Sequence, residues 1–341
     1  MVTRVLLTGG AGFIGHHVAE HILKTTDWDV TFLDRLDCSG NLNRLTEIEH
    51  WGRVKTRCRW MHHDLRAPIN GLLARQLGEH EYILHLAALT HVDRSIEDPM
   101  SAVLDNVVGT ANILEHARHA GCDRFVYFST DEVFGPAPKG VRYKEWDRYR
   151  STNPYSATKA GGEELTLAYE NTYKLPALIT HTMNVFGERQ HPEKYFPMVV
   201  QKVRDRERVT IHADPTRTIP GSRFYIHARN VADGLLFLLR YGAIGDKYNI
   251  VGEQETDNLE LARLIAGAVG KPLDYELVDF HGSRPGHDLR YALDGSKMES
   301  LGWKPPRNFL ESLYKTVQWS LAHPHWLSSI SDAAPTRKRA S

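Results

Sequence analysis

The stretch that decides the fold is VLLTGGAGFIGHHVAEHIL, Val5 to Leu23. An apolar run leads into three glycines spaced G-x-x-G-x-x-G, and an amphipathic segment typical of a helix follows. A glycine-rich turn between a first strand and a first helix lets the backbone approach a pyrophosphate, which the free N–H groups of the helix N-terminus attract. The sequence therefore predicts a dinucleotide-binding turn. The residues expected to contact the cofactor here are Gly9, Gly12, Phe13, Ile14 and Gly15.

An acidic residue at the end of the second expected strand, Asp34, indicates which dinucleotide binds. It stands near the offset of about 20 residues at which a carboxylate accepts the adenosine ribose hydroxyls, and it would repel a 2′-phosphate. The sequence thus favours NAD, although the neighbouring Arg35 leaves NADP open. Later strand ends supply three further expected cofactor contacts, Asp64, Leu65 and Ala87. A plain loop role for Asp64 is the alternative.

The pattern of apolar runs and prolines along the chain predicts two lobes. Short β-branched runs alternate with longer amphipathic segments up to about residue 180, whereas several prolines interrupt the pattern after about residue 184. We expect an α/β fold with a Rossmann-type doubly wound parallel sheet over residues 1–183 and a smaller, mixed α/β substrate-binding lobe over residues 184–328. Residues 227–243 are predicted to form an apolar helix that packs back on the first lobe, and residues 329–341 a disordered tail.

Bulk composition excludes several classes of protein. The 341 residues carry 42 basic and 42 acidic side chains, and no basic stretch is interleaved with aromatics, so nucleic acid is not an expected partner. Three cysteines without C-x-x-C spacing disfavour a disulfide framework or a zinc site. We find no signal-peptide pattern and no membrane-spanning run, and therefore expect a cytoplasmic protein without a membrane partner. The 19 histidines lack metal-like spacing, so no metal ligands are expected.

A second motif, NPYSATKAGGEEL (residues 153–165), opens a helix and places Tyr155 and Lys159 one turn apart on the same face. An ammonium beside a phenol favours the phenolate and lowers the tyrosine pKa. Thr130 follows the expected strand RFVYFS, at the sheet edge where open α/β proteins bind ligands. The three side chains together predict an acid–base site.

The glycine turn, the hydroxyl after YFS and the Y-x-x-x-K spacing together resemble the extended short-chain dehydrogenase/reductase family. This resemblance implies that Tyr155 exchanges a proton during hydride transfer at a carbinol carbon, that Thr130 binds the same oxygen, and that Lys159 also holds the nicotinamide ribose. Within that family, STDEVFG (residues 129–135) resembles the strand-end motif of the dTDP-glucose 4,6-dehydratases. Three further segments resemble theirs, at residues 85–99, 184–197 and 284–305.

The resemblance to these dehydratases implies a use for the adjacent acids Asp131 and Glu132. An NAD-dependent nucleotide-sugar 4,6-dehydratase oxidises C4 of an NDP-glucose, loses water across C5 and C6, and returns the hydride to C6. Glu132 would take the C5 proton, and protonated Asp131 would give a proton to the departing C6 hydroxyl. Two such acids need separated pKa values to divide these roles. The alternative is a charged loop that caps the next turn.

The same resemblance implies a nucleotide-sugar substrate. The residues that match the family's substrate-binding stretches are Asn184, Lys194, Arg223, Asn258, Arg284 and His287. The chain departs from the pattern at Leu89 and Thr90, where these dehydratases usually show glutamate and serine, and at Val185, where they tend to repeat asparagine. These positions leave the base and hexose open. We expect dTDP-glucose first and UDP-glucose second, with GDP- and CDP-sugars still open.

Two other functions stay open. A sugar-nucleotide 4-epimerase of the same family needs the step at Tyr155 but no C5 base, and it usually carries small or hydroxyl residues in place of Glu132. A non-catalytic NAD-binding sensor or scaffold typically loses the tyrosine or lysine that this chain keeps. The resemblance also implies a homodimer, formed by the helix after LDN (residues 104–106) and the helix at residues 153–165.

Overall fold

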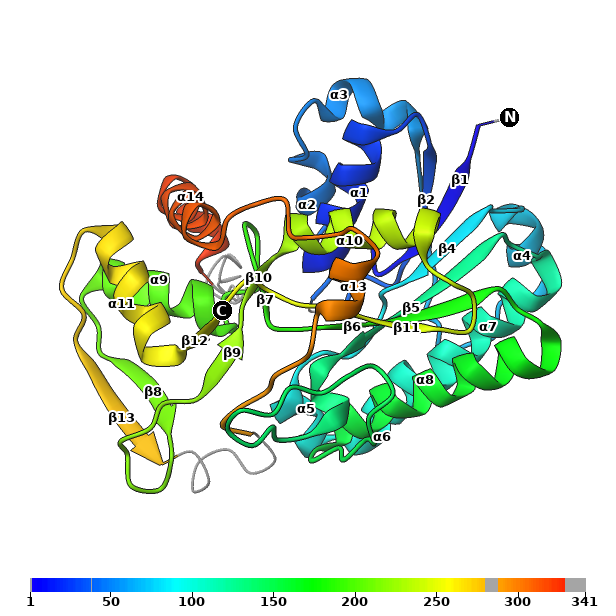
Figure 1. The fold of residues 1–341 in the computed structure, drawn as a ribbon. Coiled ribbons are helices and arrows are strands. Elements are labelled where there is room, and N and C mark those ends of the chain that lie inside the picture. The colour runs from blue at the N-terminus through cyan, green and yellow to red at the C-terminus, as the bar shows by residue number, and fades with distance from the viewer. Residues whose placement is uncertain (1, 38, 280–287, 329–341) are drawn as a thin grey trace, which may run out of the picture.

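The computed structural model of the chain describes residues 2–37, 39–279 and 288–328 (Figure 1). Its main element is a seven-stranded sheet in the order β3-β2-β1-β4-β5-β6-β11, with every neighbouring pair parallel. This is a doubly wound, Rossmann-type sheet, as predicted. The strands are β1 (Arg4–Thr8), β2 (Asp29–Asp34), β3 (Cys58–His62), β4 (Tyr82–His85), β5 (Arg124–Thr130), β6 (Ala177–Thr182) and β11 (Lys247–Ile250).

Helices cover both faces of the sheet, because the central strands present apolar side chains to both faces. On one face, α1 (Phe13–Thr25) and α10 (Ala228–Tyr241) pack against each other and on Val5, Leu7 and Phe32. The opposite face is covered by α4 (Gly71–Leu77), α7 (Gly109–Ala120) and α8 (Pro154–Tyr173).

The last strand of the sheet comes from a part of the chain that the sequence assigned to the second lobe. Strand β11 pairs in parallel with β6, with Lys247 opposite Ile179. Helix α10, just before it, also packs on the first lobe. The expected division at residue 184 therefore does not separate the two lobes in space, because residues 228–250 return to complete the sheet.

The smaller lobe has a core of its own beside the sheet (Figure 1). Strands β8 and β13 pair in parallel, and β9 and β12 pair antiparallel. Its helices pack around Phe186, Val199 and Leu261. The elements are α9 (Tyr195–Asp205), β8 (Val209–Ala213), β9 (Ser222–Phe224), β12 (Glu255–Asp257), α11 (Asn258–Val269), β13 (Tyr275–Asp279) and α14 (Phe309–Ala322). The predicted tail at residues 329–341 lies outside the described residues.

Short elements connect the two lobes and shape the loops. Strands β7 (Val185–Phe186) and β10 (Ile226–His227) pair between them. The remaining elements are α2 (Asn43–Thr46), α3 (Trp51–Val54), η1 (Lys55–Arg57), α5 (Val92–Glu97), α6 (Pro99–Val103), η2 (Leu104–Val108), η3 (Asp131–Phe134), α13 (Ser296–Ser300) and η4 (Pro324–Trp326). Among the helices of the described segments, none combines the length and apolar character needed to cross a bilayer.

Candidate active site

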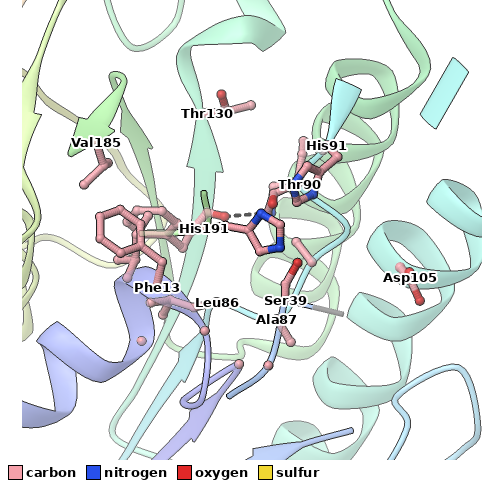
Figure 2. Close-up of a pocket in the computed structure, with 18 of the residues that line it drawn as sticks. Phe13, Ser39, Leu86, Ala87, Thr90, His91, Asp105, Thr130, Val185 and His191 are labelled. Carbon is pink, nitrogen blue, oxygen red and sulfur yellow. Dashed lines mark hydrogen bonds between the residues drawn. The ribbon is translucent and has the colours of Figure 1, made fainter. Parts of the chain in front are cut away.

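The candidate site is a cleft at the carboxyl-terminal edge of the main sheet (Figure 2). Open α/β sheets bind ligands at this edge, where the strand order reverses, here between β1 and β4. The cleft runs from the glycine turn after β1 to the residues after β5 and the first turns of α8. The predicted site residues that line it are Gly9, Gly12, Phe13, Ile14, Gly15, Asp34, Asp64, Leu65, Ala87, Thr130, Asp131, Glu132, Tyr155, Lys159, Asn184 and Lys194.

The glycine turn has no room for side chains at its three glycine positions. Gly9 has a φ of +70°, and a Cβ added there would lie 2.8 Å from the backbone nitrogen of Ala87. A Cβ on Gly12 would lie 2.9 Å from the carbonyl oxygen of Gly9, and one on Gly15 would overlap the same atom. Helix α1 begins directly after Gly12, which offers no side-chain cap, so the first N–H groups of the helix face the cleft. The turn therefore fits the pyrophosphate of a dinucleotide.

Asp34 stands at the end of β2, where the sequence places the ribose-binding acid. One of its carboxylate oxygens accepts from the backbone N–H of Ala11 at 3.1 Å, and the other accepts from that of Leu36 at 2.9 Å. Burial raises the pKa of Asp34, and these two backbone hydrogen bonds oppose the rise. The carboxylate is thus fixed in orientation beside the glycine turn that it would serve.

Arg35, which left NADP open, is held by other carboxylates. Its guanidinium donates to the two oxygens of Asp105 at 2.5 and 2.9 Å and to Asp37 at 2.7 Å. Arg66 also donates to Asp105, at 2.6 and 3.1 Å. Burial alone would raise the pKa of Asp105, but the bonds from both arginines hold it below its usual range. Because a 2′-phosphate would have to displace Asp105, the arginine does not favour NADP.

The other expected cofactor contacts also lie at strand ends. Asp64 accepts from the backbone N–H of Arg66 at 2.9 Å, which turns the chain after β3. Leu65, the next residue, is buried and lines the cleft. The backbone N–H of Ala87 donates to the hydroxyl of Thr8 at 3.1 Å, which joins the ends of β4 and β1. These contacts build the wall on which an adenosine would lie.

The two adjacent acids follow β5 in a single turn of 3₁₀ helix. The Thr130 hydroxyl donates to one oxygen of Asp131 at 3.0 Å and accepts from the backbone N–H of Glu132 at 3.3 Å. The other oxygen of Asp131 is buried and has no hydrogen-bond partner among the described residues. Asn153 donates to Glu132 at 3.2 Å. Within the described segments, Asp131 therefore has one carboxylate oxygen without a hydrogen bond, whereas the side-chain amide of Asn153 orients Glu132.

The environments of the two acids raise both pKa values. Burial, followed by the charge of Glu132, raises the pKa of Asp131 to about 7. Burial also raises the pKa of Glu132, while the hydrogen bond from Asn153 and the charges of Arg223 and Lys194 oppose that rise. Asp131 is thus partly protonated near neutral pH, as a general acid must be.

Tyr155 and Lys159 share one face of α8, as the sequence predicts. Asn153 caps this helix by accepting from the backbone N–H of Ser156 at 2.8 Å, and Pro154 occupies the first turn. The Lys159 ammonium donates to the backbone carbonyl of Phe128 at 2.7 Å, and burial lowers its pKa to about 7. The cap therefore sets the direction from which both side chains enter the cleft.

The expected lowering of the Tyr155 pKa is not seen. Burial raises this pKa above its ordinary value, the charge of Glu132 adds to the rise, and a hydrogen bond with Thr130 opposes it. Lys159 instead directs its ammonium to the carbonyl at the end of β5. The helical spacing predicted that both side chains enter the cleft, but it did not reveal that burial dominates the pKa of each.

The predicted substrate residues divide into three groups. Asn184 is exposed in the cleft, and Lys194 lines it while donating to the carbonyl of Thr90 at 3.1 Å. Arg223 and Asn258 do not line the cleft: Arg223 donates to three backbone carbonyls in its own lobe, and Asn258 accepts from the hydroxyl of Tyr225 at 2.6 Å. The other two predicted residues, Arg284 and His287, lie outside the described residues.

Comparison with known proteins places the chain in a family. The family model described as GDP-mannose 4,6 dehydratase matches residues 6–316. The chain belongs to the nucleotide-sugar 4,6-dehydratase family. A dTDP-glucose 4,6-dehydratase of Salmonella typhimurium is 34% identical over 357 residues, covering 97% of this chain and 96% of that protein. The low-salt glycan biosynthesis protein Agl12 of Haloferax volcanii is 38% identical over 318 residues, covering 93% of this chain and 98% of that protein.

A solved structure extends this dehydratase relationship to the fold. The dTDP-glucose 4,6-dehydratase DesIV of Streptomyces venezuelae, crystallised with NAD bound, superposes with a TM-score of 0.86 at 35% identity. The match covers 95% of this chain and 98% of that one. The family resemblance and the Rossmann-type fold predicted from the sequence are thereby confirmed.

Several site residues of this dehydratase-family chain were not predicted. Asn153 was foreseeable as a helix cap from the Asn-Pro step, but its second contact, with Glu132, depends on the tertiary fold. Asp105 carries no motif, because its partners Arg35 and Arg66 come from the loops after β2 and β3. Nor did the sequence indicate that His91, His191 and Glu193 would meet.

Proposed function

We propose that this chain is an NAD-dependent nucleotide-sugar 4,6-dehydratase that converts an NDP-glucose to the NDP-4-keto-6-deoxyglucose. The observation that carries the proposal is the adjacent pair Asp131 and Glu132, placed with Tyr155 in a cleft continuous with the dinucleotide-binding turn. An epimerase needs one acid–base residue at C4, whereas loss of water across C5 and C6 needs a second base and an acid. We propose Tyr155, Glu132 and Asp131 for these three roles.

The first step takes place at C4 of the hexose. Tyr155 takes the proton of the C4 hydroxyl, and the Thr130 hydroxyl, which turns from Asp131 to the substrate, donates a hydrogen bond to the same oxygen. When bound, NAD would supply the hydride acceptor for C4 and the hydride donor for C6, and the glycine turn, Asp34 and Lys159 would hold it. Lys159, whose pKa of about 7 lets it change charge readily, would favour the phenolate of Tyr155 when it is charged.

The elimination then uses the two acids. The C4 ketone acidifies the C5 hydrogen, which Glu132 removes as a proton. The C6–O bond breaks, and Asp131 gives its proton to the departing hydroxyl, which leaves as water. Glu132 finally returns its proton to C5. Because Tyr155 has then gained one proton and Asp131 has lost one, a proton passed from the phenol to the carboxylate resets the site.

The nucleotide assignment rests on the relatives and on the residues around the cleft. Several relatives are named dTDP-glucose 4,6-dehydratases, so dTDP-glucose is the first substrate we propose and UDP-glucose the second. Asn184 and Lys194 are the proposed contacts of the diphosphate. Arg223 acts on the site through its charge, which lowers the pKa values of Asp131 and Glu132.

The decisive experiment is incubation of the purified protein with NAD and dTDP-, UDP-, GDP- or CDP-glucose in turn. We expect a 4-keto-6-deoxy product from dTDP-glucose, detected by its alkaline ultraviolet absorbance and by the loss of one water in mass spectrometry. Tyr155→Phe should reduce this turnover by about 10²- to 10⁴-fold. A C4 epimer without loss of water would instead establish the epimerase. No turnover with any nucleotide sugar, together with tight NAD binding, would favour the non-catalytic alternative.

We also propose a cytoplasmic homodimer. The helices implied in the contact, α7 and α8, lie side by side on one face of the sheet (Figure 1). Light scattering coupled to gel filtration should give twice the 38.8 kDa mass of the chain. A monomer mass at micromolar concentration would contradict the dimer without touching the proposed reaction.

A further inference from the structure

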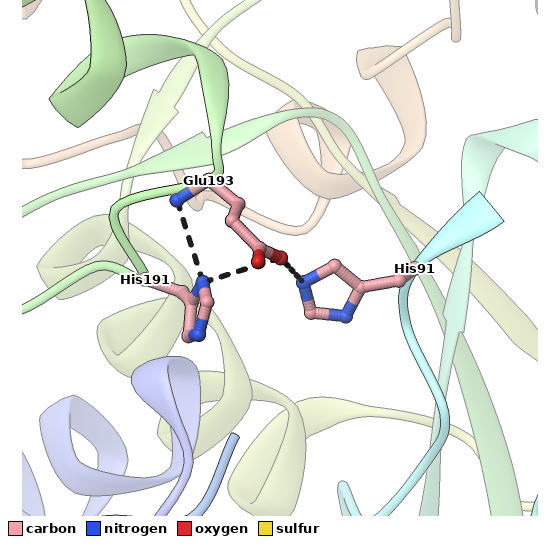
Figure 3. A group of neighbouring side chains, drawn as sticks. All are labelled: His91, His191 and Glu193. Carbon is pink, nitrogen blue, oxygen red and sulfur yellow. Dashed lines mark hydrogen bonds and ion pairs between the residues drawn. The ribbon is translucent and has the colours of Figure 1, made fainter. Parts of the chain in front are cut away.

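Two loops that are distant in sequence bring two histidines and a glutamate together beside the cleft (Figure 3). His91 ends the loop after β4, and His191 and Glu193 lie in the loop before α9. The Nε2 atom of His91 lies 3.7 Å from Oε2 of Glu193, and the Nδ1 atom of His191 lies 3.8 Å from the same oxygen. The three potential ligand atoms all lie within 4.8 Å of one another.

Both imidazole nitrogens are available as ligands. Nε2 of His91 is buried and makes no hydrogen bond within the described part of the chain. Nδ1 of His191 faces the backbone N–H of Glu193 at 3.4 Å, which is long for a hydrogen bond.

We propose that His91, His191 and Glu193 bind a divalent transition metal of the zinc class at the mouth of the active-site cleft. Two histidines and one carboxylate are a known zinc ligand set, and tetrahedral bonds of about 2.0–2.2 Å place ligand atoms about 3.4 Å apart. The separations of 3.7 and 3.8 Å to the carboxylate are close to that value. Small side-chain rotations complete the site.

The remaining coordination position faces the cleft. His91 and His191 line the same cleft as Thr130 (Figure 2). Water or an anionic oxygen from the cleft supplies the fourth ligand, as in zinc sites with an open position. The proposed dehydration needs no metal, so this site is independent of the proposed function.

One existing contact competes with the metal. Arg94 donates to Glu193 at 3.1 Å, and its side chain is 36% exposed while that of Glu193 is 53% exposed. Exposed ion pairs of this kind are weak, so the cation displaces the arginine at little cost. Removing Arg94 should therefore strengthen metal binding, an effect that a purely structural role for the two histidines does not predict.

The test uses the full-length protein without a histidine tag. Co²⁺ is titrated into it and followed by its visible absorption, and Zn²⁺ is then added to displace it. We expect one tightly held Co²⁺ per chain and stoichiometric displacement. His191→Ala and Glu193→Gln should each weaken binding at least about tenfold, and Arg94→Gln should strengthen it about twofold to fivefold. Circular dichroism with a thermal melt shows that each variant is folded.

A matched control comes from a histidine–glutamate pair that has no third potential ligand among the described residues. His119 lies 3.7 Å from Glu115 on α7, at the i,i+4 spacing. His119→Ala should leave Co²⁺ affinity unchanged. Two results would overturn the proposal: absence of a bound Co²⁺ absorption in the wild type at millimolar metal, or an affinity that survives His191→Ala in the folded variant.

Discussion

Two buried carboxylates contact neighbouring residues of β5 but have opposite environments: Asp131 contacts Thr130, and Glu163 contacts Ser129. Glu163 on α8 is fully buried and accepts from Ser129, Tyr149, His181 and Lys247. Burial alone would raise its pKa, but His181 and Lys247 hold the pKa below its usual range. Asp131 is nearly as buried, has one unpartnered oxygen, and its pKa is raised to about 7.

The number of hydrogen-bond partners separates a structural buried acid from a reactive one. A buried charge with several partners is stabilised where it is, so it gives up its proton and stays ionised. A buried acid left half-satisfied keeps its proton close to neutral pH and faces the cleft, which makes it reactive. Strand alternation decides which acid receives which partner, because Ser129 and Thr130 point to opposite faces of the sheet.

The largest expected effect separates the two carboxylates by activity. Asp131→Asn should reduce formation of the 4-keto-6-deoxy sugar by about 10²- to 10⁴-fold, because the amide gives no proton to the departing hydroxyl. The variant should be at least as stable as the wild type at pH 8, since it removes a buried, half-satisfied charge. Steady-state kinetics and urea unfolding measure the two quantities.

Asp246, an acid paired with Lys297 at 2.6 Å outside the cleft, provides the control for this first variant. Asp246→Asn should leave turnover unchanged. Full activity of Asp131→Asn would show that Asp131 is not the acid. The two carboxylates would then not differ in their chemical role.

The second effect concerns stability. Glu163→Gln should lower the free energy of unfolding by about 3–5 kcal/mol, because Lys247, whose side chain is only 4% exposed, is left without its charge partner. Urea unfolding followed by circular dichroism measures this loss. The control is Glu311→Gln, which breaks an exposed pair with Lys315 and should change nothing measurable. Wild-type stability in Glu163→Gln would show that the buried network is dispensable.

The third effect is a pair of opposite pH dependences. The pKa of Asp131 rises from about 3.9 when unfolded to about 7 when folded, so its contribution to stability is greatest below pH 4 and is lost as pH rises to 7. The pKa of Glu163 falls on folding, so its contribution is present above about pH 4.3 and is lost as pH falls below that value.

The difference in unfolding free energy between the wild type and each variant should therefore change with pH in opposite directions for the two variants. The difference for Asp131→Asn should decline between pH 4 and 7, and that for Glu163→Gln should decline towards acid below about pH 4. Parallel slopes for the two variants would mean that the two carboxylates titrate alike.

The smallest effect separates neighbours on one strand. Thr130→Val should lower turnover about tenfold and Thr130→Ser should restore most of it, because the hydroxyl serves the cleft. Ser129→Ala should instead lower the free energy of unfolding by about 1.5 kcal/mol with little change in turnover, since its hydroxyl serves Glu163. Kinetics and urea unfolding on the same preparations compare them. If Ser129→Ala lost more turnover than Thr130→Val, the hydroxyl of Ser129 and not that of Thr130 would serve the cleft.

The sequence predicted those site residues whose placement follows from local geometry. The glycine turn, Asp34 at the end of the second strand, and Tyr155 with Lys159 one helical turn apart all line the cleft. Each depends on a strand, a turn or a single helix, which spacing alone describes. Arg223 and Asn258 were expected in the site on resemblance, yet they face their own lobe.

The sequence alone therefore predicted the parallel sheet as far as β6, the glycine turn at its edge, and the placement of Tyr155 and Lys159, for which we propose acid–base roles, because these depend on contacts within about one turn or strand. The charge state of each group depends instead on the tertiary structure. Burial raises the pKa of Tyr155 against the effect expected of Lys159, and it leaves Asp131 near neutrality. Desolvation and long-range pairing, such as Arg35 with Asp105 or His91 with Glu193, arise from packing between distant segments, which spacing along a chain does not encode.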